Sequence, residues 1–117
     1  MFIDFDKLEE AVLPEFKGGE GVTLNRAFSD GFNKIMRGRL PVGSLIGYHK
    51  HEDNSEIVLI LSGEARLLYD DGEELLTAGD CHYCPSGHSH SLINNSKSCE
   101  LEFFAVVPEH KKLCDFA

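Results

Sequence analysis

The stretch "SLIGYHKHEDNSEIVLILSG", residues 44–63, decides the fold, because it places three potential metal ligands directly before a strongly apolar run. "SLIGYHKH" predicts a strand in which His49 and His51 point the same way, about 7 Å apart at the backbone, so both imidazoles can converge on one ion. The polar "EDNS" lets the chain reverse, and Glu56 opens the next strand, which closes at Gly63. The stretch therefore predicts two β-strands with a cluster of ligands where they meet.

The remainder of the chain repeats this pattern of short strands and turns. "NKIMRGRL", "CHYC" and "HSLINNS" read as strands, and "EARLLYDDGEELLTAGD" reads as a hairpin around an Asp-Gly turn. "CELEFFAVV" places four apolar side chains on one face: Leu101, Phe103, Ala105 and Val107. About eight short strands with frequent turns predict an all-β sandwich or small barrel.

The two ends of the chain are read differently. Asp4 to Leu13 has an approximate helical stripe and is predicted to form a short N-terminal helix that ends at Pro14. The tail "EHKKLCDFA" is compatible with a helical turn or with a frayed end. Without an internal repeat or linker, we expect one domain over residues 1–117, with an arm at 1–22, a core barrel at about 23–107 and a tail at 108–117.

A second polar cluster lies downstream, in "PSGHSHSLIN", residues 85–94, where His90 starts a strand. Taken together, the two clusters resemble the two signature motifs of the cupin superfamily. The matching positions are Gly43, His49, His51, Glu56 and Gly63 in the first motif, and Gly79, Pro85, Gly87, His90 and Asn94 in the second. The resemblance covers Gly43 to Asn94 by motif, and the flanking strands by pattern only.

This resemblance implies a small antiparallel β-barrel of the jelly-roll (double-stranded β-helix) type with a metal inside. Carried over by position, the metal ligands are His49, His51, Glu56 and His90. His88 could share the face of His90, but the family spacing selects His90. We do not expect His82, His88 or His110 to bind the metal.

Three imidazoles and one carboxylate suit one divalent transition metal, and Fe, Mn, Ni, Zn and Cu all remain open. Apolar residues on the ligand-bearing faces are predicted to line a pocket beside it: Leu45, Val58, Ile60, Leu92 and Phe103. Arg37 and Arg39 share a strand face and would be able to clamp a substrate carboxylate if that face points inward. Because the turn "LPVG" interrupts the two-residue alternation of side chains, the sequence does not show whether that face points inward.

The resemblance implies a metal-dependent enzyme acting on a small polar metabolite, with dioxygenase, isomerase or decarboxylase-like chemistry. The alternative is a non-catalytic cupin that binds a small molecule or metal as a sensor or storage module. Cupins of this size are commonly dimers, so a homodimer is expected. No second acid–base pair stands out in the sequence.

The amino-acid composition excludes some classes of binding partner. The 117 residues carry a net charge of −9, which argues against binding to nucleic acid or to an anionic membrane. The N-terminus lacks the basic-then-apolar pattern of a secretory signal, so a cytoplasmic location is expected. There the four cysteines, Cys81, Cys84, Cys99 and Cys114, are predicted to be packed free thiols, with an oxidation-sensitive or secondary metal role as the alternative.

Overall fold

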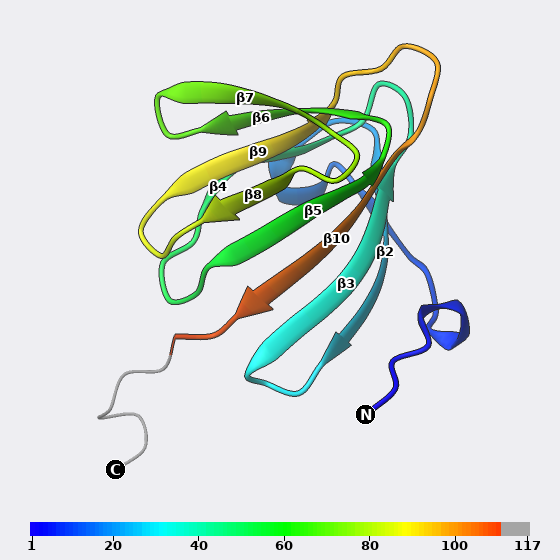
Figure 1. The fold of residues 1–117 in the computed structure, drawn as a ribbon, viewed down its shortest axis with the longest axis vertical. Helices are drawn as coiled ribbons and strands as arrows, with labels where there is room; N and C mark the ends of the chain where they lie inside the picture. The colour runs from blue at the N-terminus through cyan, green and yellow to red at the C-terminus, as the bar shows by residue number, and fades with distance from the viewer. Residues whose placement is uncertain (111–117) are drawn as a thin grey trace.

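The computed structural model describes residues 1–110, which form two antiparallel β-sheets (Figure 1). The first sheet has the order β1 (Ala11–Pro14), β2 (Val22–Ser29), β3 (Asn33–Leu40), β10 (Leu101–Pro108), β5 (Glu56–Ser62) and β8 (Cys81–Cys84). The second has the order β4 (Leu45–Lys50), β9 (Ser89–Asn94), β6 (Glu64–Tyr69) and β7 (Gly72–Thr77). The predicted all-β, jelly-roll type of fold is confirmed.

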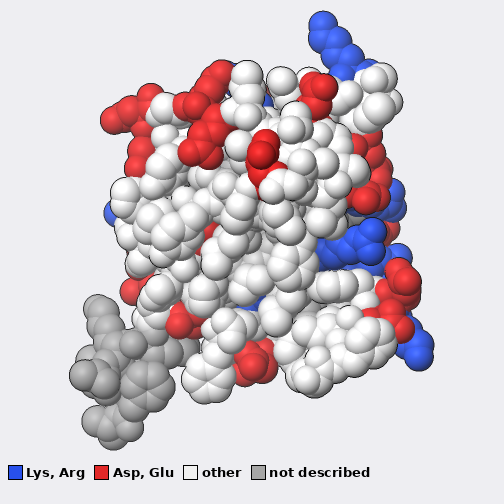
Figure 2. Space-filling model, viewed as in Figure 1, with Lys and Arg blue, Asp and Glu red and all other residues white. Residues whose placement is uncertain are grey.

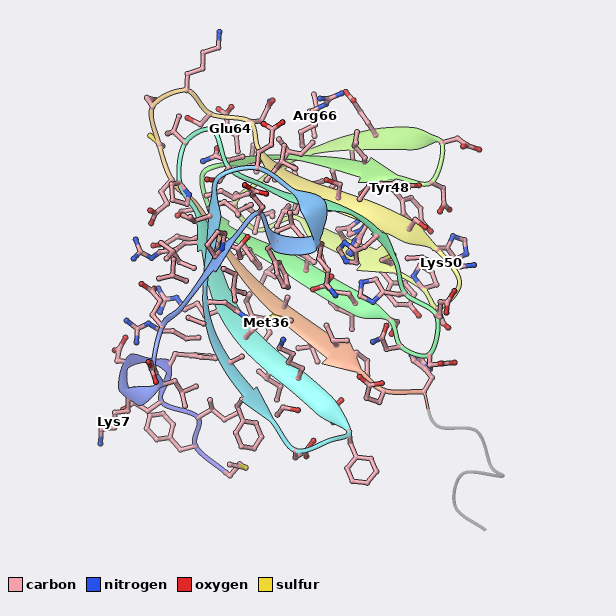
Figure 3. All side chains as sticks on the ribbon, turned by 180° about the vertical axis from the view of Figure 1, so that it is seen from behind. Lys7, Met36, Tyr48, Lys50, Glu64 and Arg66 are labelled. Carbon is pink, nitrogen blue, oxygen red and sulfur yellow. The ribbon has the colours of Figure 1, made fainter. Side chains whose placement is uncertain are left out.

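The core lies between the two sheets and follows from the two-residue period of the strands. Along β10, the predicted inward residues Leu101, Phe103, Ala105 and Val107 are buried, and the residues between them are partly exposed. They pack with buried apolar side chains of the neighbouring strands, including Leu67 from the second sheet. Figure 3 shows the outward side chains of β4, Tyr48 and Lys50, projecting away from this core, as their exposure requires.

The N-terminal segment corrects one prediction. The helix expected over Asp4 to Leu13 is wrong: the structure has a single 3-10 turn, η1 (Phe5–Lys7), followed by strand β1. Leu13 lies opposite Thr23 on β2, so this part of the predicted arm extends the first sheet by one strand. A short isolated helix is only marginally stable in water, whereas an edge strand gains backbone hydrogen bonds from β2.

Strand β4 contains an irregularity that sets the orientation of the site. Ile46 pairs with Leu92 and His49 pairs with His90, so β4 advances by one residue more than β9 between these two pairs. This extra residue is a β-bulge, and it reverses the alternation of side chains along β4. Ile46 and His49 consequently face the same side, and Leu45 faces the other.

A second short turn, η2 (Phe16–Gly18), packs directly on β4. A Cβ atom built on Gly47 would lie 2.1 Å from the carbonyl oxygen of Lys17, and one on Gly19 would lie 2.1 Å from that of Leu45. Lys17 itself has a φ of 57°, which is unusual for a residue with a side chain. The close approach at Gly19 and Gly47, together with the unusual backbone conformation of Lys17, therefore places Lys17 beside the strand that carries the histidines.

No helix in residues 1–110 is long and apolar enough to cross a membrane.

Candidate metal centre

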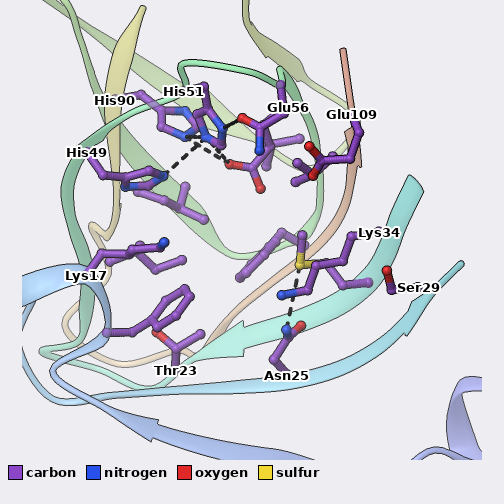
Figure 4. Close-up of a pocket in the computed structure, with 18 residues that line it drawn as sticks. Lys17, Thr23, Asn25, Ser29, Lys34, His49, His51, Glu56, His90 and Glu109 are labelled. Carbon is purple, nitrogen blue, oxygen red and sulfur yellow. Dashed lines mark hydrogen bonds and ion pairs between the residues drawn. The ribbon is translucent and has the colours of Figure 1, made fainter. Parts of the chain in front are cut away.

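Three imidazole rings and one carboxylate meet at one end of the space between the sheets (Figure 4). The Nε2 atom of His51 lies 3.2 Å from that of His49 and 3.0 Å from that of His90. The Oε1 atom of Glu56 lies 3.3 Å from the Nε2 atom of His51 and 2.9 Å from that of His90. The structure thus brings together the four residues that the two motifs had singled out, from β4, β5, β9 and the turn after β4.

The outward-facing nitrogens of two of these rings are fixed by hydrogen bonds. Nδ1 of His49 donates to the carbonyl oxygen of Gly47 at 2.7 Å, because a carbonyl can only accept. Nδ1 of His51 donates to Oδ1 of Asn54 at 2.6 Å. A neutral imidazole that carries its proton on Nδ1 has a lone pair on Nε2, so both rings direct lone pairs toward the cluster.

His90 is oriented by a longer chain of hydrogen bonds that sequence reasoning missed. Nδ1 of His82 donates to the Glu74 carboxylate at 2.7 Å, which leaves Nε2 of His82 as an acceptor. Nδ1 of His90 donates to that nitrogen at 3.0 Å. His82 is buried, and its ring is inclined by only 26° to the ring of His90. The third Nε2 lone pair is thereby directed into the same cluster. In this way His82 supports the cluster without facing it.

The cluster therefore contains four acceptors and no donor. Three lone pairs and a carboxylate at 2.9 to 3.3 Å repel one another unless a cation lies among them. Imidazole and carboxylate suit divalent first-row metals, and hydrogen-bonded Nδ1 atoms are the usual support of metal-binding histidines. These residues fit a metal ion.

When no metal is bound, protons can supply the positive charge that the cluster requires. Burial raises the pKa of Glu56, but when protons rather than a metal occupy the cluster, Glu56 accepts hydrogen bonds from His51 and His90, and these lower its pKa to about 2. The hydrogen bond with Glu56 raises the pKa of His51, whereas burial lowers the pKa of His49. Glu56 is therefore ionised at neutral pH, and a proton on His51 can take the place of a metal.

The three described cysteines are free thiols, as predicted, but only Cys84 is packed: the prediction of packing is wrong for Cys81 and Cys99, which are exposed. Cys114 lies outside the described residues. Cys81 is exposed and Cys84 is buried, as expected for residues three apart on a strand. Cys84 lies near His82 and His90, but burial raises the pKa of its thiol to about 11. A thiol in that state is a poor metal ligand, since the thiolate is the binding form.

A cavity of about 230 Å³ opens beside the cluster. Of the predicted lining residues, Val58, Leu92 and Phe103 contribute to its wall. Leu45 does not, because the bulge in β4 turns Ile46 inward in its place. Ile60 does not either, since it is fully buried in the core between the sheets.

The two arginines do not line this cavity. Met36, Gly38 and Leu40 are the buried residues of β3, so Arg37 and Arg39 lie on its outer face. Arg39 pairs with Glu10 at 2.7 Å and with Glu100 at 3.1 Å, and Arg37 lies 3.7 Å from Glu102. The clamp on a substrate carboxylate that an inward face would have provided is therefore not formed by these residues.

Several polar residues in the cavity wall escaped the sequence analysis: Lys17, Thr23, Asn25, Lys34 and Glu109. Lys17 lies in an irregular turn, where no periodicity indicates its direction. Thr23 and Asn25 alternate on β2, and that polar alternation was a signal that could have been read. Figure 4 shows Lys17 and Lys34 on different sides of the cavity, with the histidine cluster at its far end.

The fold and the site are those of a small all-β protein with a cluster of residues able to hold a metal ion. Comparison with known proteins specifies the family. The model of the cupin domain family matches residues 36–107, so the chain belongs to the cupin family. An oxalate-binding protein of Thermotoga maritima is 46% identical over 102 residues, which cover 81% of this chain and 83% of that protein.

Solved structures agree with this assignment. The crystal structure of a predicted oxalate decarboxylase from Thermotoga maritima has a TM-score of 0.86 at 30% identity and covers 93% of this chain and 99% of its own. A sugar phosphate isomerase of the cupin superfamily from Silicibacter pomeroyi has a TM-score of 0.75 at 23% identity, covering 93% and 76%. The second similarity shows a shared fold and nothing more.

Proposed function

We propose that this chain is a metal-dependent enzyme whose substrate is a small organic acid anion bound at the metal. His49, His51, Glu56 and His90 would hold one divalent transition metal. The observation that carries the proposal is the convergence of three Nε2 lone pairs and one carboxylate without a donor among them. The acceptors of such a site repel one another, and a cation among them removes that repulsion.

The charges in the cavity favour an anionic substrate. Among the described residues that line it, Lys17 and Lys34 balance Glu56 and Glu109. A divalent ion would then leave a net positive charge, inside a protein whose overall charge is −9. A low-dielectric cavity with excess positive charge attracts and holds anions. The names of two relatives, an oxalate-binding protein and a predicted oxalate decarboxylase, support a carboxylate as the binding group.

Each side chain then has a distinct role. A bound metal would supply Lewis-acid chemistry, polarising the oxygen atoms of the substrate. Lys17 would hold a substrate carboxylate by charge. Glu109, the second carboxylate of the cavity, would exchange a proton with the substrate during the reaction. Among the reaction types that the resemblance left open, the predicted oxalate decarboxylase favours decarboxylation.

The second candidate is a non-catalytic binding protein. It is favoured by the 46% identity to a protein known by its binding of oxalate. Both candidates use the same metal and the same anion, and they differ only in turnover.

One experiment separates them. The protein and His51→Ala are each reconstituted with Fe, Mn, Ni, Zn or Cu, and bound metal is measured after desalting. We expect about one ion per chain in the wild type and loss of that ion in the variant. Oxalate is then added to the loaded protein, and binding heat and carbon dioxide release are recorded. Release of carbon dioxide supports the enzyme, and binding without release supports the binding protein. A wild type that holds none of the five metals would refute the proposal.

A homodimer remains a prediction. The outer face of β5 and β8 exposes three apolar side chains, with exposed fractions of 40% for Ile57, 38% for Leu61 and 54% for Tyr83. Figure 2 shows few charged side chains in the middle of the face where these strands lie. Covering this face with a second copy would remove apolar area from water. A monomeric mass by light scattering would contradict the prediction.

A further inference from the structure

The inner face of β2 is polar, although it faces the interior of the protein. Thr23 and Asn25 lie two residues apart on this strand, and their exposed fractions are only 2% and 7%. Both side chains line the cavity beside the metal centre. The neighbouring strands present apolar residues to the same cavity, including Met36 and Phe103. An inward polar pair on one strand needs an explanation, because inward positions of a β-sandwich are normally apolar.

These two side chains also lack partners. Within residues 1–110, the Thr23 Oγ1 and Asn25 Oδ1 atoms are the only buried side-chain nitrogen or oxygen atoms without a hydrogen bond. The Asn25 amide nitrogen has only the Met36 sulfur, at 3.6 Å, and a thioether is a weak acceptor. Unsatisfied buried polar atoms are rare and costly, and two in one cavity indicate a missing partner. The Asn25 amide oxygen requires a hydrogen-bond donor, and the Thr23 hydroxyl can accept from the same group.

The polar pair and the metal centre lie at opposite ends of the cavity. Figure 4 shows Thr23 and Asn25 on one side and the cluster of His49, His51, Glu56 and His90 on the other, with Lys17 between them. Doubly ionised oxalate binds a metal through its oxygens and has no hydrogen-bond donor. It can satisfy the metal end, but it cannot donate a hydrogen bond to the Asn25 amide oxygen at the other end.

We propose that the ligand of this site is an organic acid longer than oxalate, with a hydroxyl group at the end remote from the metal. Its carboxylate and an adjacent oxygen would bind the metal, and its remote hydroxyl would donate to Asn25 or Thr23. This assignment rests on the proposed function for its metal end only. A hydroxyl is a better donor here than an ammonium group, because the loaded cavity already carries excess positive charge.

The Met36 sulfur contacts the Asn25 amide nitrogen, and the Met36 side chain lines the cavity beside it. Its unbranched thioether has several rotatable bonds and adapts readily to a new neighbour. Met36 can thus adjust to a ligand beside it, and the Asn25 amide oxygen would gain a hydrogen bond from the ligand hydroxyl. In the free protein the unpaired oxygens lower the free energy of unfolding, and a bound ligand that donates a hydrogen bond removes that loss.

The test uses a matched ligand pair, α-hydroxyhexanoate and its α,ω-dihydroxy counterpart, together with the shorter pentanoate and butanoate pairs. The metal-binding ends are identical, and only the remote hydroxyl differs. Zinc-loaded protein is titrated with each by calorimetry, after zinc binding itself has been measured. For at least one chain length we expect the dihydroxy acid to bind about tenfold more tightly or better.

Two variants identify the residues responsible. Thr23→Val is isosteric and removes the hydroxyl, and Asn25→Leu removes the amide. In the double variant we expect the preference to fall to within about twofold, with zinc and oxalate affinity unchanged. We also expect the ligand-free double variant to melt at a higher temperature than the wild type, because the unpaired oxygens are gone.

The outcomes separate the two proposals. If zinc binds but the hydroxyl gives no preference at any chain length, this inference is refuted and the metal-dependent function stands. It is equally refuted if the preference survives in the double variant. A protein that binds no zinc or other divalent metal overturns both.

Discussion

His82 offers the most informative perturbation, because its predicted role is to position a metal ligand rather than to bind the metal. We consider His82→Phe. The phenyl ring can fill the buried site of the imidazole, whose centroid lies 5.2 Å from that of His90, but it cannot accept the hydrogen bond from His90 Nδ1. The Glu74 carboxylate that His82 releases is 40% exposed, so water can solvate it. The substitution therefore acts mainly on the orientation and the proton of His90.

The expected effect is a loss of metal affinity of about 10- to 100-fold, the usual range for partners that orient a metal-binding histidine. At about 1.4 kcal/mol per tenfold change, this corresponds to ~1.4–2.8 kcal/mol. The cause is that Nδ1 of His90 loses its acceptor, so the tautomer with the lone pair on Nε2 is no longer selected. The buried N–H left without a partner adds to the cost.

The assay is a competition titration against a chromophoric chelator, with zinc as the metal. His88→Phe is the matched control, since His88 lies close to His90 in the chain but pairs with Asp70 at 2.6 Å on the surface. We expect the control to keep the affinity of the wild type within about twofold. A His82→Phe protein that folds and binds zinc as tightly as the control would refute the positioning role.

Three further predictions concern the same region. Because the hydrogen bond with Glu56 raises the pKa of His51, protons compete with the metal from a higher pH than at an ordinary imidazole; metal affinity should fall as the pH is lowered from about 7 toward 5, and a flat profile in a chelator titration would contradict this. Lys17→Met should weaken oxalate binding about fivefold (~1 kcal/mol) without lowering zinc affinity, measured by calorimetry against Lys50→Met, whose side chain projects outward. Gly47→Ala should lower the free energy of unfolding by ~1–3 kcal/mol, because its Cβ would lie 2.1 Å from the Lys17 carbonyl oxygen, whereas Gly72→Ala meets its nearest atom at 3.7 Å and should be nearly neutral in urea unfolding.

The sequence by itself determined the strands and the four residues of the cluster. Alternation over two residues is a local property, and so "CELEFFAVV" and "NKIMRGRL" could be assigned without knowledge of their partners. The spacing of His49, His51, Glu56 and His90 within two motifs was likewise visible along the chain. The same local reasoning failed at Asp4 to Leu13, where pairing with β2 outweighed a weak helical stripe.

Only the tertiary structure decided what surrounds the cluster. The bulge in β4 turned the side chain of Ile46, rather than that of Leu45, toward the cavity. The packing of η2 on Gly47 brought Lys17 to the cavity wall. Arg37 and Arg39 went to the outer face because the register of β3 against β10 places Met36 and Gly38 inside. His82 reached His90 because β8 and β9 lie in different sheets that face each other across the core. Register, bulges and contacts between sheets depend on residues far apart in the chain, and no local period encodes them.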